Sequence, residues 1–295
     1  MKEFNGLNIG FVGGDLRDVI LMKHFQGMGA KVFVLGSSPT DLSVSEVDNM
    51  PEFLHAVDVV MAPMPGVDKD GNLKGAFLKS GLVLDDNFFQ LLGPQKPLII
   101  GVMPDNIYNK ALQMGANIIR TAELDEIAVL NAIPTAEGAI QIALAESKRT
   151  LFGSKAIMFG LGRIGRILGR RLVLLGTEVY GVARRPASYA WGQDLGIKPL
   201  TECQFESIIP QAHFVFNTVP GLVVDEKILK MCKKDVIIID LASAPGGVDF
   251  DSAKALGLKA LLALGLPGKM SPESAGEILC QEYPRLIQEA RKNYK

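Results

Sequence analysis

The stretch that decides the fold is Lys155-Ala-Ile-Met-Phe-Gly-Leu-Gly-Arg-Ile-Gly-Arg-Ile-Leu-Gly-Arg-Arg-Leu172. An apolar run ends at Gly160, and the residues after the glycines follow a helical apolar rhythm, which predicts a strand, a tight turn and a helix. Gly160, Gly162 and Gly165 form a Gly-x-Gly-x-x-Gly pattern. The first glycine permits the turn, the second lets the backbone approach a pyrophosphate, and the third lets the helix pack on the strand. The stretch therefore predicts a Rossmann dinucleotide-binding unit.

Further strands are predicted beyond this unit, and they end in polar or Gly/Pro turns. The strand from His213 ends in Asn217-Thr218-Val219-Pro220, and the strand from Val236 ends in Asp240-Leu-Ala-Ser243. Turns at the carboxyl ends of parallel strands line a dinucleotide crevice. The fingerprint and these turns give the following predicted cofactor contacts: Gly160, Gly162, Arg163, Ile164, Gly165, Asn217, Thr218, Val219, Pro220, Asp240 and Ser243.

The end of the second strand of this unit indicates which dinucleotide is bound. NAD-specific folds place Asp or Glu there, about 20 residues beyond the fingerprint, whereas this chain has Ala183-Arg184-Arg185. Two guanidiniums suit a 2′-phosphate, so Arg184 and Arg185 favour NADP; the alternative is that they are solvated surface charges. The spacing of Arg166, Arg170 and Arg171 predicts a solvated helix face instead.

A second strand, glycine turn and helix opens the chain at Leu7 to Met28, through Gly13-Gly14-Asp15. This turn is not a dinucleotide fingerprint, because Asp15 would place a carboxylate where a phosphate would sit. Asp15 is either an N-cap of the helix or, with Arg17, part of a ligand site at the carboxyl end of the first strand. Short β-branched strands alternating with helices predict a doubly wound sheet for this half.

Between the halves, a helical pattern runs from Thr121 to about Lys148, and Pro134 is expected to break or kink it into two helices that meet at a joint. Thr135 is then either a cap of the second helix or, with Glu137, part of a ligand site at the joint. We predict an N-terminal substrate domain over 1–149, a Rossmann domain over 150–271, a helix over 272–295 that packs back on the first domain, and a cleft between the two α/β domains.

Composition narrows the class of protein. The chain has 295 residues, a formal net charge of −1 and 48% hydrophobic residues, which argues against a nucleic-acid or anionic-membrane surface. No stretch approaches the roughly 18 uninterrupted apolar residues of a membrane span. Cys203, Cys232 and Cys280 lack metal-ligand spacing, so we expect no metal site but buried or half-buried free thiols in a reducing cytoplasm.

Histidine is scarce, with only His24, His55 and His213 in the chain. Dehydrogenases that act on an alcohol usually need a base on the hydroxyl proton, and imidazole is the usual choice. His213 begins a strand, at the end away from the expected cofactor crevice. An alcohol dehydrogenase is therefore disfavoured, although Asp, Glu or Lys could also act as the base.

With these motifs assembled, the chain resembles the family of dipicolinate synthase A subunits over nearly its whole length. The resemblance rests on the fingerprint and on Gly13-Gly-Asp-Leu-Arg17, Asn131-Ala-Ile-Pro-Thr-Ala-Glu-Gly-Ala-Ile140 and Leu266-Pro-Gly-Lys-Met-Ser-Pro-Glu-Ser-Ala-Gly276. It implies NADP-linked oxidation of a dihydrodipicolinate-type ring to aromatic dipicolinate in the mother cell of a sporulating bacterium. It also implies a second, flavoprotein-like component, the B subunit of dipicolinate synthase, and we expect a homo-oligomer.

A dicarboxylate substrate needs cations or oriented N–H donors. The candidates are Arg17, oriented by Asp15; Lys269 from a late glycine-rich loop; and the N-terminus of a helix that begins near Thr135, with Glu137 beside it. Two other readings stay open. One is a dehydrogenase of small 2-hydroxy acids with the same architecture, and the other is a subunit that binds NADP without turnover.

Overall fold

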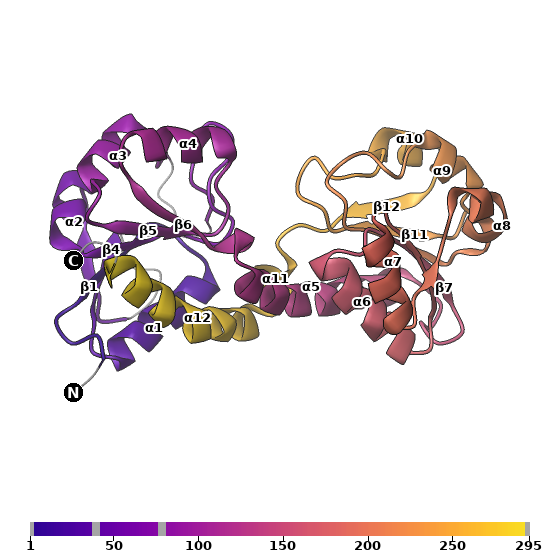
Figure 1. Cartoon of the computed structure of the whole chain (residues 1–295), viewed down its shortest axis with the longest axis horizontal. Helices are drawn as coiled ribbons and strands as arrows, with labels where there is room; N and C mark the ends of the chain where they lie inside the picture. The colour runs from indigo at the N-terminus through magenta and orange to yellow at the C-terminus, as the bar shows by residue number, and fades with distance from the viewer. Residues whose placement is uncertain (1–2, 37–41, 76–80, 293–295) are drawn as a thin grey trace. The chain divides into compact units, whose positions relative to one another are not determined.

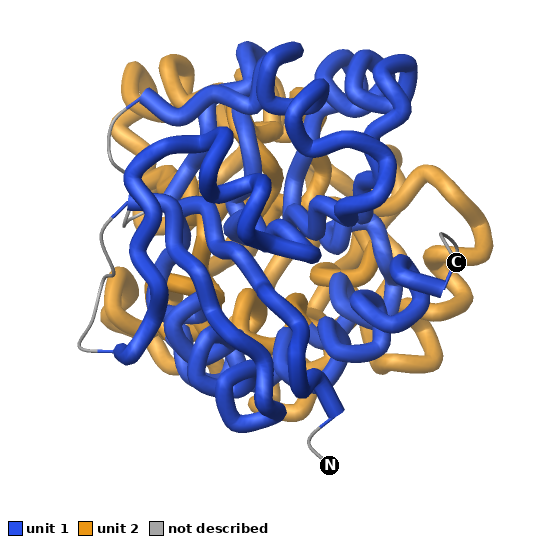
Figure 2. Tube along the Cα trace, turned by 90° about the vertical axis from the view of Figure 1, so that its left-hand side faces the viewer, with its two compact units in different colours: residues 1–130, 271–295 blue, residues 131–270 orange. Residues whose placement is uncertain are grey.

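The computed structural model describes residues 3–36, 42–75 and 81–292. The chain forms two compact units, which Figure 2 distinguishes by colour. Unit 1 comprises residues 1–130 and 271–295, and unit 2 comprises residues 131–270. Within these described residues, each unit contains one six-stranded sheet in which every pair of neighbouring strands is parallel. The predicted α/β class, with two doubly wound domains, is confirmed.

Unit 1 is built on the sheet order β3-β2-β1-β4-β5-β6. Its strands are β1 (Asn8–Phe11), β2 (Lys31–Leu35), β3 (Ser45–Val47), β4 (Val59–Met61), β5 (Pro97–Ile100) and β6 (Asn117–Arg120). Its helices are α1 (Leu16–Gly27), α2 (Met50–Ala56), α3 (Asp86–Leu92), α4 (Asp105–Gln113), the 3₁₀ turn η1 (Thr121–Glu123) and α12 (Pro272–Lys292).

Side chains of β1 alternate between two apolar layers, one on each face of the sheet. Ile9 and Phe11 pack into the layer that also holds residues of α1 and α12. Gly10 points to the other layer, where a Cβ atom would lie 2.4 Å from the ring of Phe53. Figure 1 shows α2, α3 and α4 on one side of this sheet and α1 and α12 on the other. Both faces of β1 are therefore buried, which explains its continuous apolar sequence.

Unit 2 has the sheet order β12-β11-β10-β7-β8-β9. Its strands are β7 (Lys155–Phe159), β8 (Glu178–Val182), β9 (Lys198–Pro199), β10 (Phe214–Asn217), β11 (Ile237–Asp240) and β12 (Lys259–Leu262). Its helices are α6 (Arg163–Leu174), α7 (Pro186–Asp194), α8 (Phe205–Ile208), α9 (Glu226–Met231), α10 (Phe250–Ala255) and α11 (Leu266–Met270), with 3₁₀ turns η2 (Glu202–Gln204) and η3 (Ile209–Gln211).

The helix α5 (Asp125–Glu146) corrects one prediction. Pro134 lies inside it, and the helix continues without a break, so the two helices and the joint expected there do not form. A proline removes a single backbone donor, and the surrounding Ala, Leu and Ile residues are compatible with a helix on both sides. Thr135 donates from Oγ1 to the Asn131 carbonyl oxygen, 2.9 Å away, one turn earlier in the same helix.

Helix α5 is also long and apolar enough to cross a membrane, by length and composition alone. It contributes Ile127 to an apolar core of unit 1, and Ala136, Ala139 and Ala143 to a core of unit 2. Glu137 lies exposed between those buried positions. These contacts are those of a core helix shared by two domains.

The unit boundaries differ from the predicted ones. The first division falls at 130/131, inside α5, rather than at 149/150, and the second falls at 270/271. Helix α12 packs on α1 within unit 1, where a Cβ atom at Gly276 would lie 2.8 Å from Ile20. Residues 293–295 of the range predicted for this helix lie outside the described residues.

Candidate functional site

The three glycines of the turn after β7 have different surroundings. Gly160 has a φ of +91°, and a Cβ atom there would lie 2.4 Å from Oγ1 of Thr218. A Cβ atom at Gly165 would lie 2.0 Å from the carbonyl oxygen of Gly160, which explains the close approach of α6 to the turn. A Cβ atom at Gly162 would meet no atom within 4 Å. Gly160 and Gly165 are thus required by packing, whereas Gly162 leaves open space.

That open space lies at the N-terminus of α6. Gly162 is the N-cap residue of this 12-residue helix and, being a glycine, provides no side-chain cap. The N–H groups at a helix N-terminus, together with the helix dipole, attract phosphate. Arg163 is exposed and Ile164 half-buried in that turn. The residues present therefore fit the pyrophosphate of a dinucleotide.

A cavity of about 880 Å³ extends from this turn along the carboxyl ends of β7 and β8. Six of the predicted cofactor contacts line it: Gly160, Gly162, Arg184, Arg185, Val219 and Pro220. Apolar side chains of Val182, Leu200, Phe205 and Leu222 line it as well. A largely apolar cavity of this size with a few polar groups is typical of a cofactor site.

Asn217 and Asp240 lie in a buried network next to the cavity. Both residues are 0% exposed, and Asn217 Nδ2 donates to Asp240 Oδ1 (2.8 Å) and to the Val219 carbonyl (2.9 Å). Asp240 also accepts from the backbone N–H groups of Ala242, Gly247 and Val248. Because these polar atoms are occupied by protein partners, the two side chains position the loops after β10 and β11, which differs from the direct cofactor contact predicted.

Thr218 and Ser243 also have positions other than the cavity wall. Thr218 Oγ1 lies 3.1 Å from the Phe159 carbonyl and 3.2 Å from the Gly160 carbonyl, so it fixes the glycine turn to the end of β10. Ser243 is exposed, and its carbonyl accepts from the N–H of Gly246. The loop after β10 therefore supports the cavity through Thr218 and lines it through Val219 and Pro220.

The turn after β8 carries Arg184 and Arg185, and the hydroxyl of a half-buried tyrosine holds it in place. Tyr189 Oη accepts from the N–H of Ala183 (3.1 Å) and donates to the Leu200 carbonyl (3.3 Å). Both arginines are exposed at the cavity wall. Arg166 from the first turns of α6 lines the same cavity, which the prediction of a solvated face missed. Its position directly after Gly165 was the available signal.

The glycine turn of unit 1 is closed by its own side chains. Asp15 is the N-cap of α1, accepting from the Arg17 N–H at 3.0 Å, and Asp18 Oδ2 accepts from the Asp15 N–H at 2.8 Å. Arg17 is only 5% exposed and pairs with Asp15 through Nε (2.9 Å) and Nη2 (2.6 Å). The carboxylate of Asp15 therefore occupies both the N-terminus of α1 and the guanidinium of Arg17.

A cluster of buried polar groups lies beneath this turn. Tyr283 of α12 is 3.1 Å from Thr121 Oγ1 through its hydroxyl, and both side chains contact the sulfur of Met64. Burial raises the pKa of Tyr283, and it raises the pKa of Asp18 to about 7, partly offset by the Asp15 N–H and the Arg17 charge. A carboxyl that titrates near neutral pH thus lies at the carboxyl end of β1.

The remaining predicted substrate contacts lie on α5 and α11, which meet where a Cβ atom at Gly138 would lie 3.2 Å from Leu266. Thr135 is buried in the interior of α5, so no helix N-terminus forms there. Glu137 is exposed and lies 3.6 Å from Arg171. Lys269 is exposed on the short helix α11, not on a loop. Cys203 is exposed, which corrects the burial predicted for all three thiols; Cys232 and Cys280 are half-buried.

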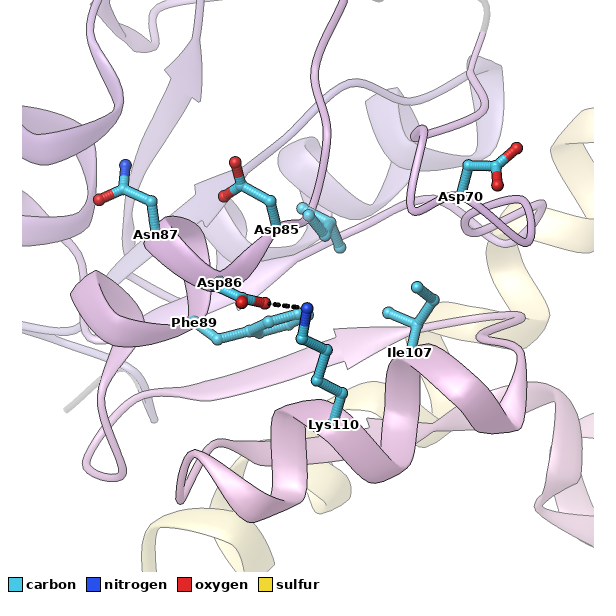
Figure 3. A pocket seen from close by; sticks show the side chains of 8 residues that line it. Asp70, Asp85, Asp86, Asn87, Phe89, Ile107 and Lys110 are labelled. Carbon is cyan, nitrogen blue, oxygen red and sulfur yellow. Dashed lines mark ion pairs between the residues drawn. The ribbon is translucent and has the colours of Figure 1, made fainter.

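Figure 3 shows a separate cavity of about 430 Å³ in unit 1, between α3 and α4. Lys110 pairs with Asp86 there at 2.6 Å, and Asp85 caps α3 by accepting from the Phe88 N–H. None of the predicted site residues lines this cavity. Within residues 3–36, 42–75 and 81–292, no group of three or more His, Cys, Asp or Glu side chains could hold a metal ion.

His213 lies at the opposite end of the unit 2 sheet from the cavity. Its Nδ1 accepts from the N–H of Lys155, the first residue of β7, at 2.9 Å. Burial and the nearby Lys233 lower its pKa. The cavity is lined at the carboxyl ends of the strands, so the predicted separation of His213 from it is confirmed.

Each half of the chain is similar to a known protein family. Residues 8–122 match the family of N-terminal domains of dipicolinate synthase A subunits. Residues 133–265 match the NAD-binding domain of D-isomer specific 2-hydroxyacid dehydrogenases. The second match supports a nicotinamide dinucleotide as the cofactor of unit 2.

Relatives from two Bacillus species match over nearly the full length of the chain. The dipicolinate synthase A subunit of Bacillus subtilis (strain 168) is 29% identical over 96% of this chain and 97% of its own. The crystal structure of the Bacillus halodurans counterpart has a TM-score of 0.87 at 29% identity, covering 96% of this chain and 98% of its own. The Bacillus subtilis structure has a TM-score of 0.88 at 28% identity, covering 99% of both chains.

Proposed function

We propose, from the resemblance of the whole chain to dipicolinate synthase A subunits, that this protein oxidises a dihydrodipicolinate-type ring to dipicolinate with NADP. The observation that carries the proposal is the similarity over 96% of the chain, which includes both units. The dehydrogenase-type match of unit 2 supports an oxidoreductase. The glycine turn and the 880 Å³ cavity are consistent with the required dinucleotide.

NADP rather than NAD is the second part of the proposal. Arg184 and Arg185 stand at the cavity wall where NAD-specific folds carry an acidic residue. Among the described residues, neither arginine forms an ion pair with a carboxylate of the chain. Two uncompensated guanidiniums would bind a 2′-phosphate through charge-assisted hydrogen bonds.

The residues near the cavity suit a reaction without a strong base. A bound nicotinamide supplies the hydride acceptor, and loss of the ring proton is favoured because the product is aromatic. The chain's part is to hold the dinucleotide through the Gly162 turn and to support the wall through Thr218 and Asn217. The distant position of His213 is compatible with such a reaction.

The dicarboxylate requires cations, and Arg17 and Lys269 remain our candidates. Arg17 is held rigidly by Asp15, so its charge is largely compensated, and it would contribute oriented N–H groups more than net charge. Lys269 is exposed and can supply the charge. Thr135 and Glu137 remain lower candidates because they lie within α5. The cleft predicted between the domains stays a prediction.

The resemblance also suggests the cellular setting. We propose that the chain works with the flavoprotein-like B subunit of dipicolinate synthase in the cytoplasm of the mother cell of a sporulating bacterium, and that it forms a homo-oligomer. Co-purification of the two proteins and light scattering of the complex would test these points. A chain that turns over alone at the full rate would contradict the need for a partner.

Formation of dipicolinate tests the reaction directly. The lysine-pathway precursor and NADP are supplied to the purified chain, with and without the second protein, and the ultraviolet absorption of dipicolinate is followed. We expect absorption that depends on NADP. NADP binding without product under either condition would support a non-catalytic NADP-binding protein instead.

A dehydrogenase of 2-hydroxy acids is a second candidate, because unit 2 matches the NAD-binding domain of that class. Its test is reduction of small 2-oxo acids with NADPH or NADH. Turnover of a 2-oxo acid without dipicolinate formation would favour this reading. The position of His213 outside the cavity counts against it.

A further inference from the structure

Arg166 differs from the other arginines of α6 in its surroundings. Arg170 is exposed and lines a separate cavity with Val173, Leu174 and Asp194. Arg166 is half-buried and lines the cofactor cavity together with Arg184 and Arg185. Arg166 and Arg170 lie one turn apart on α6 but line two different cavities.

Two contacts fix the guanidinium of Arg166. Its Nε donates to the carbonyl oxygen of Leu161, inside the glycine turn, at 3.0 Å. The ring of Trp191, on α7, lies 5.5 Å from the guanidinium carbon. One of the five N–H donors of the group is used by Leu161, so four remain on the terminal nitrogens. The side chain is held in place before any ligand binds.

The charges around the cavity are not balanced. Across the residues that the structure describes, none of Arg166, Arg184 and Arg185 forms an ion pair with a carboxylate. Glu202 is the acidic residue of the lining. Three guanidiniums from α6 and from the β8–α7 turn thus line one cavity with a single carboxylate.

We propose that Arg166 is a third guanidinium of the 2′-phosphate subsite and the main determinant of NADP preference. This inference rests on the proposed use of NADP. A half-buried charge is screened by solvent and salt less than the exposed charges of Arg184 and Arg185. The fixed orientation of Arg166 also lowers the entropy lost when it binds an anion. It therefore discriminates between the cofactors more strongly than either exposed arginine.

Calorimetric titration of the full chain with NADPH, NADH, 2′,5′-ADP and 5′-AMP tests the proposal. We expect R166Q to weaken binding of NADPH and 2′,5′-ADP by roughly ten- to hundredfold, since a charge-assisted hydrogen bond contributes about 1.5–3 kcal/mol. Binding of NADH and 5′-AMP should change less than about threefold. R170Q is the matched control from the next turn of the helix and should bind all four ligands as the wild type does.

The outcomes separate this proposal from the proposed function. A wild type that binds NADH as tightly as NADPH contradicts NADP use and, with it, the role of Arg166. A wild type that prefers NADPH, with R166Q losing both cofactors equally or neither, overturns the role of Arg166 alone. If thermal unfolding shows R166Q to be unfolded, R166K is used: a several-fold loss confined to the 2′-phosphorylated ligands supports the proposal, and unchanged selectivity overturns it.

Discussion

In unit 1 the turn after β1 leads into Asp15, whose carboxylate caps α1, while in unit 2 the turn after β7 leads into Gly162, which leaves the N-terminus of α6 open. The sheets around the two turns have the same strand order. Unit 1 reads 3-2-1-4-5-6, and unit 2, counted from β7, reads 6-5-4-1-2-3, the same order from the other edge. The fold is shared, so one residue at the helix N-terminus distinguishes a self-capped turn from a turn that fits a phosphate.

The largest expected effect comes from breaking the closed turn. Asp15→Ala leaves Arg17, 5% exposed, without its carboxylate and removes the cap of α1. We expect a loss of about 3–5 kcal/mol in the free energy of unfolding of unit 1, because an uncompensated charge stays buried. Urea unfolding followed by circular dichroism measures it.

Asp225→Ala is the control for that experiment. Asp225 caps α9 by accepting from the Ile228 N–H and has no buried arginine beside it. Its loss should cost about 1 kcal/mol, the usual cost of a lost cap. Equal losses in both variants would show that the Asp15–Arg17 pair contributes nothing beyond the cap.

A side-chain cap placed at Gly162, in the open turn after β7, should strongly weaken NADPH binding. Gly162→Asp places in unit 2 the residue type that unit 1 carries, and a Cβ atom there meets nothing within 4 Å. The new carboxylate would cap α6 and repel the pyrophosphate, so we expect NADPH binding to fall about a hundredfold or more, roughly 2.7 kcal/mol, while stability is kept. Calorimetry and thermal unfolding measure the two effects.

The charge and the size of the new side chain can be separated with Gly162→Asn. Asparagine caps as well as aspartate but is neutral. We expect it to bind NADPH less weakly than Gly162→Asp does. Equal NADPH affinity of Gly162→Asp and Gly162→Asn would mean that the presence of a capping side chain, and not its negative charge, excludes the cofactor.

The closed turn should also make the free energy of unfolding of unit 1 depend on pH through Asp18. Burial raises the pKa of Asp18 to about 7 from the ordinary 3.8. The folded state holds this proton more tightly than the unfolded state does, so the free energy of unfolding falls as pH rises from about 4 to about 7, by about 1 kcal/mol per pH unit, and then levels off.

Asp18→Asn removes that titration. Urea unfolding of the wild type and the variant between pH 5 and 8 should show a flatter profile for the variant in this range. Parallel profiles for the two proteins would contradict an Asp18 that is protonated near neutral pH.

The smallest expected effect concerns the turn after β8, which carries Arg184 and Arg185 at the wall of the same cavity. Tyr189→Phe removes the hydroxyl that bonds the Ala183 N–H and the Leu200 carbonyl. We expect a stability loss of about 1 kcal/mol and a several-fold weaker binding of NADPH, since the backbone before Arg184 is held less firmly. Tyr108→Phe, in α4 of unit 1, is a control that should leave NADPH binding unchanged.

The features predictable from the sequence were those with local signals. Apolar runs followed by glycines identified β1 and β7, and Gly160, Gly162 and Arg184 were placed at the cavity from spacing alone. The structure explains why other residues were misplaced. Pro134 suggests a helix end locally, but buried alanines on the C-terminal side keep α5 continuous.

Burial and long-range partners were beyond the reach of the sequence. Nothing near Asn217 in the chain indicates that Asp240 completes its hydrogen bonds, 23 residues later. Apart from following Gly165, Arg166 looks like Arg170 in a helical pattern, and its contacts with the Leu161 carbonyl and with Trp191 of α7 distinguish it. The role of Tyr283 depends on Thr121, 162 residues away.

Because helix α12 belongs to unit 1, the cores of the two units can be completed at different times during synthesis. Leu279, Tyr283, Leu286 and Ile287 of α12 are part of an apolar core of unit 1, together with Ile9 and Phe11 of β1. All of unit 2 is translated between these two groups of residues. While the chain emerges from the ribosome, unit 2 can complete its core first, whereas the face of the unit 1 sheet that α1 and α12 cover is complete only after α12, which follows unit 2 in the sequence, has been translated.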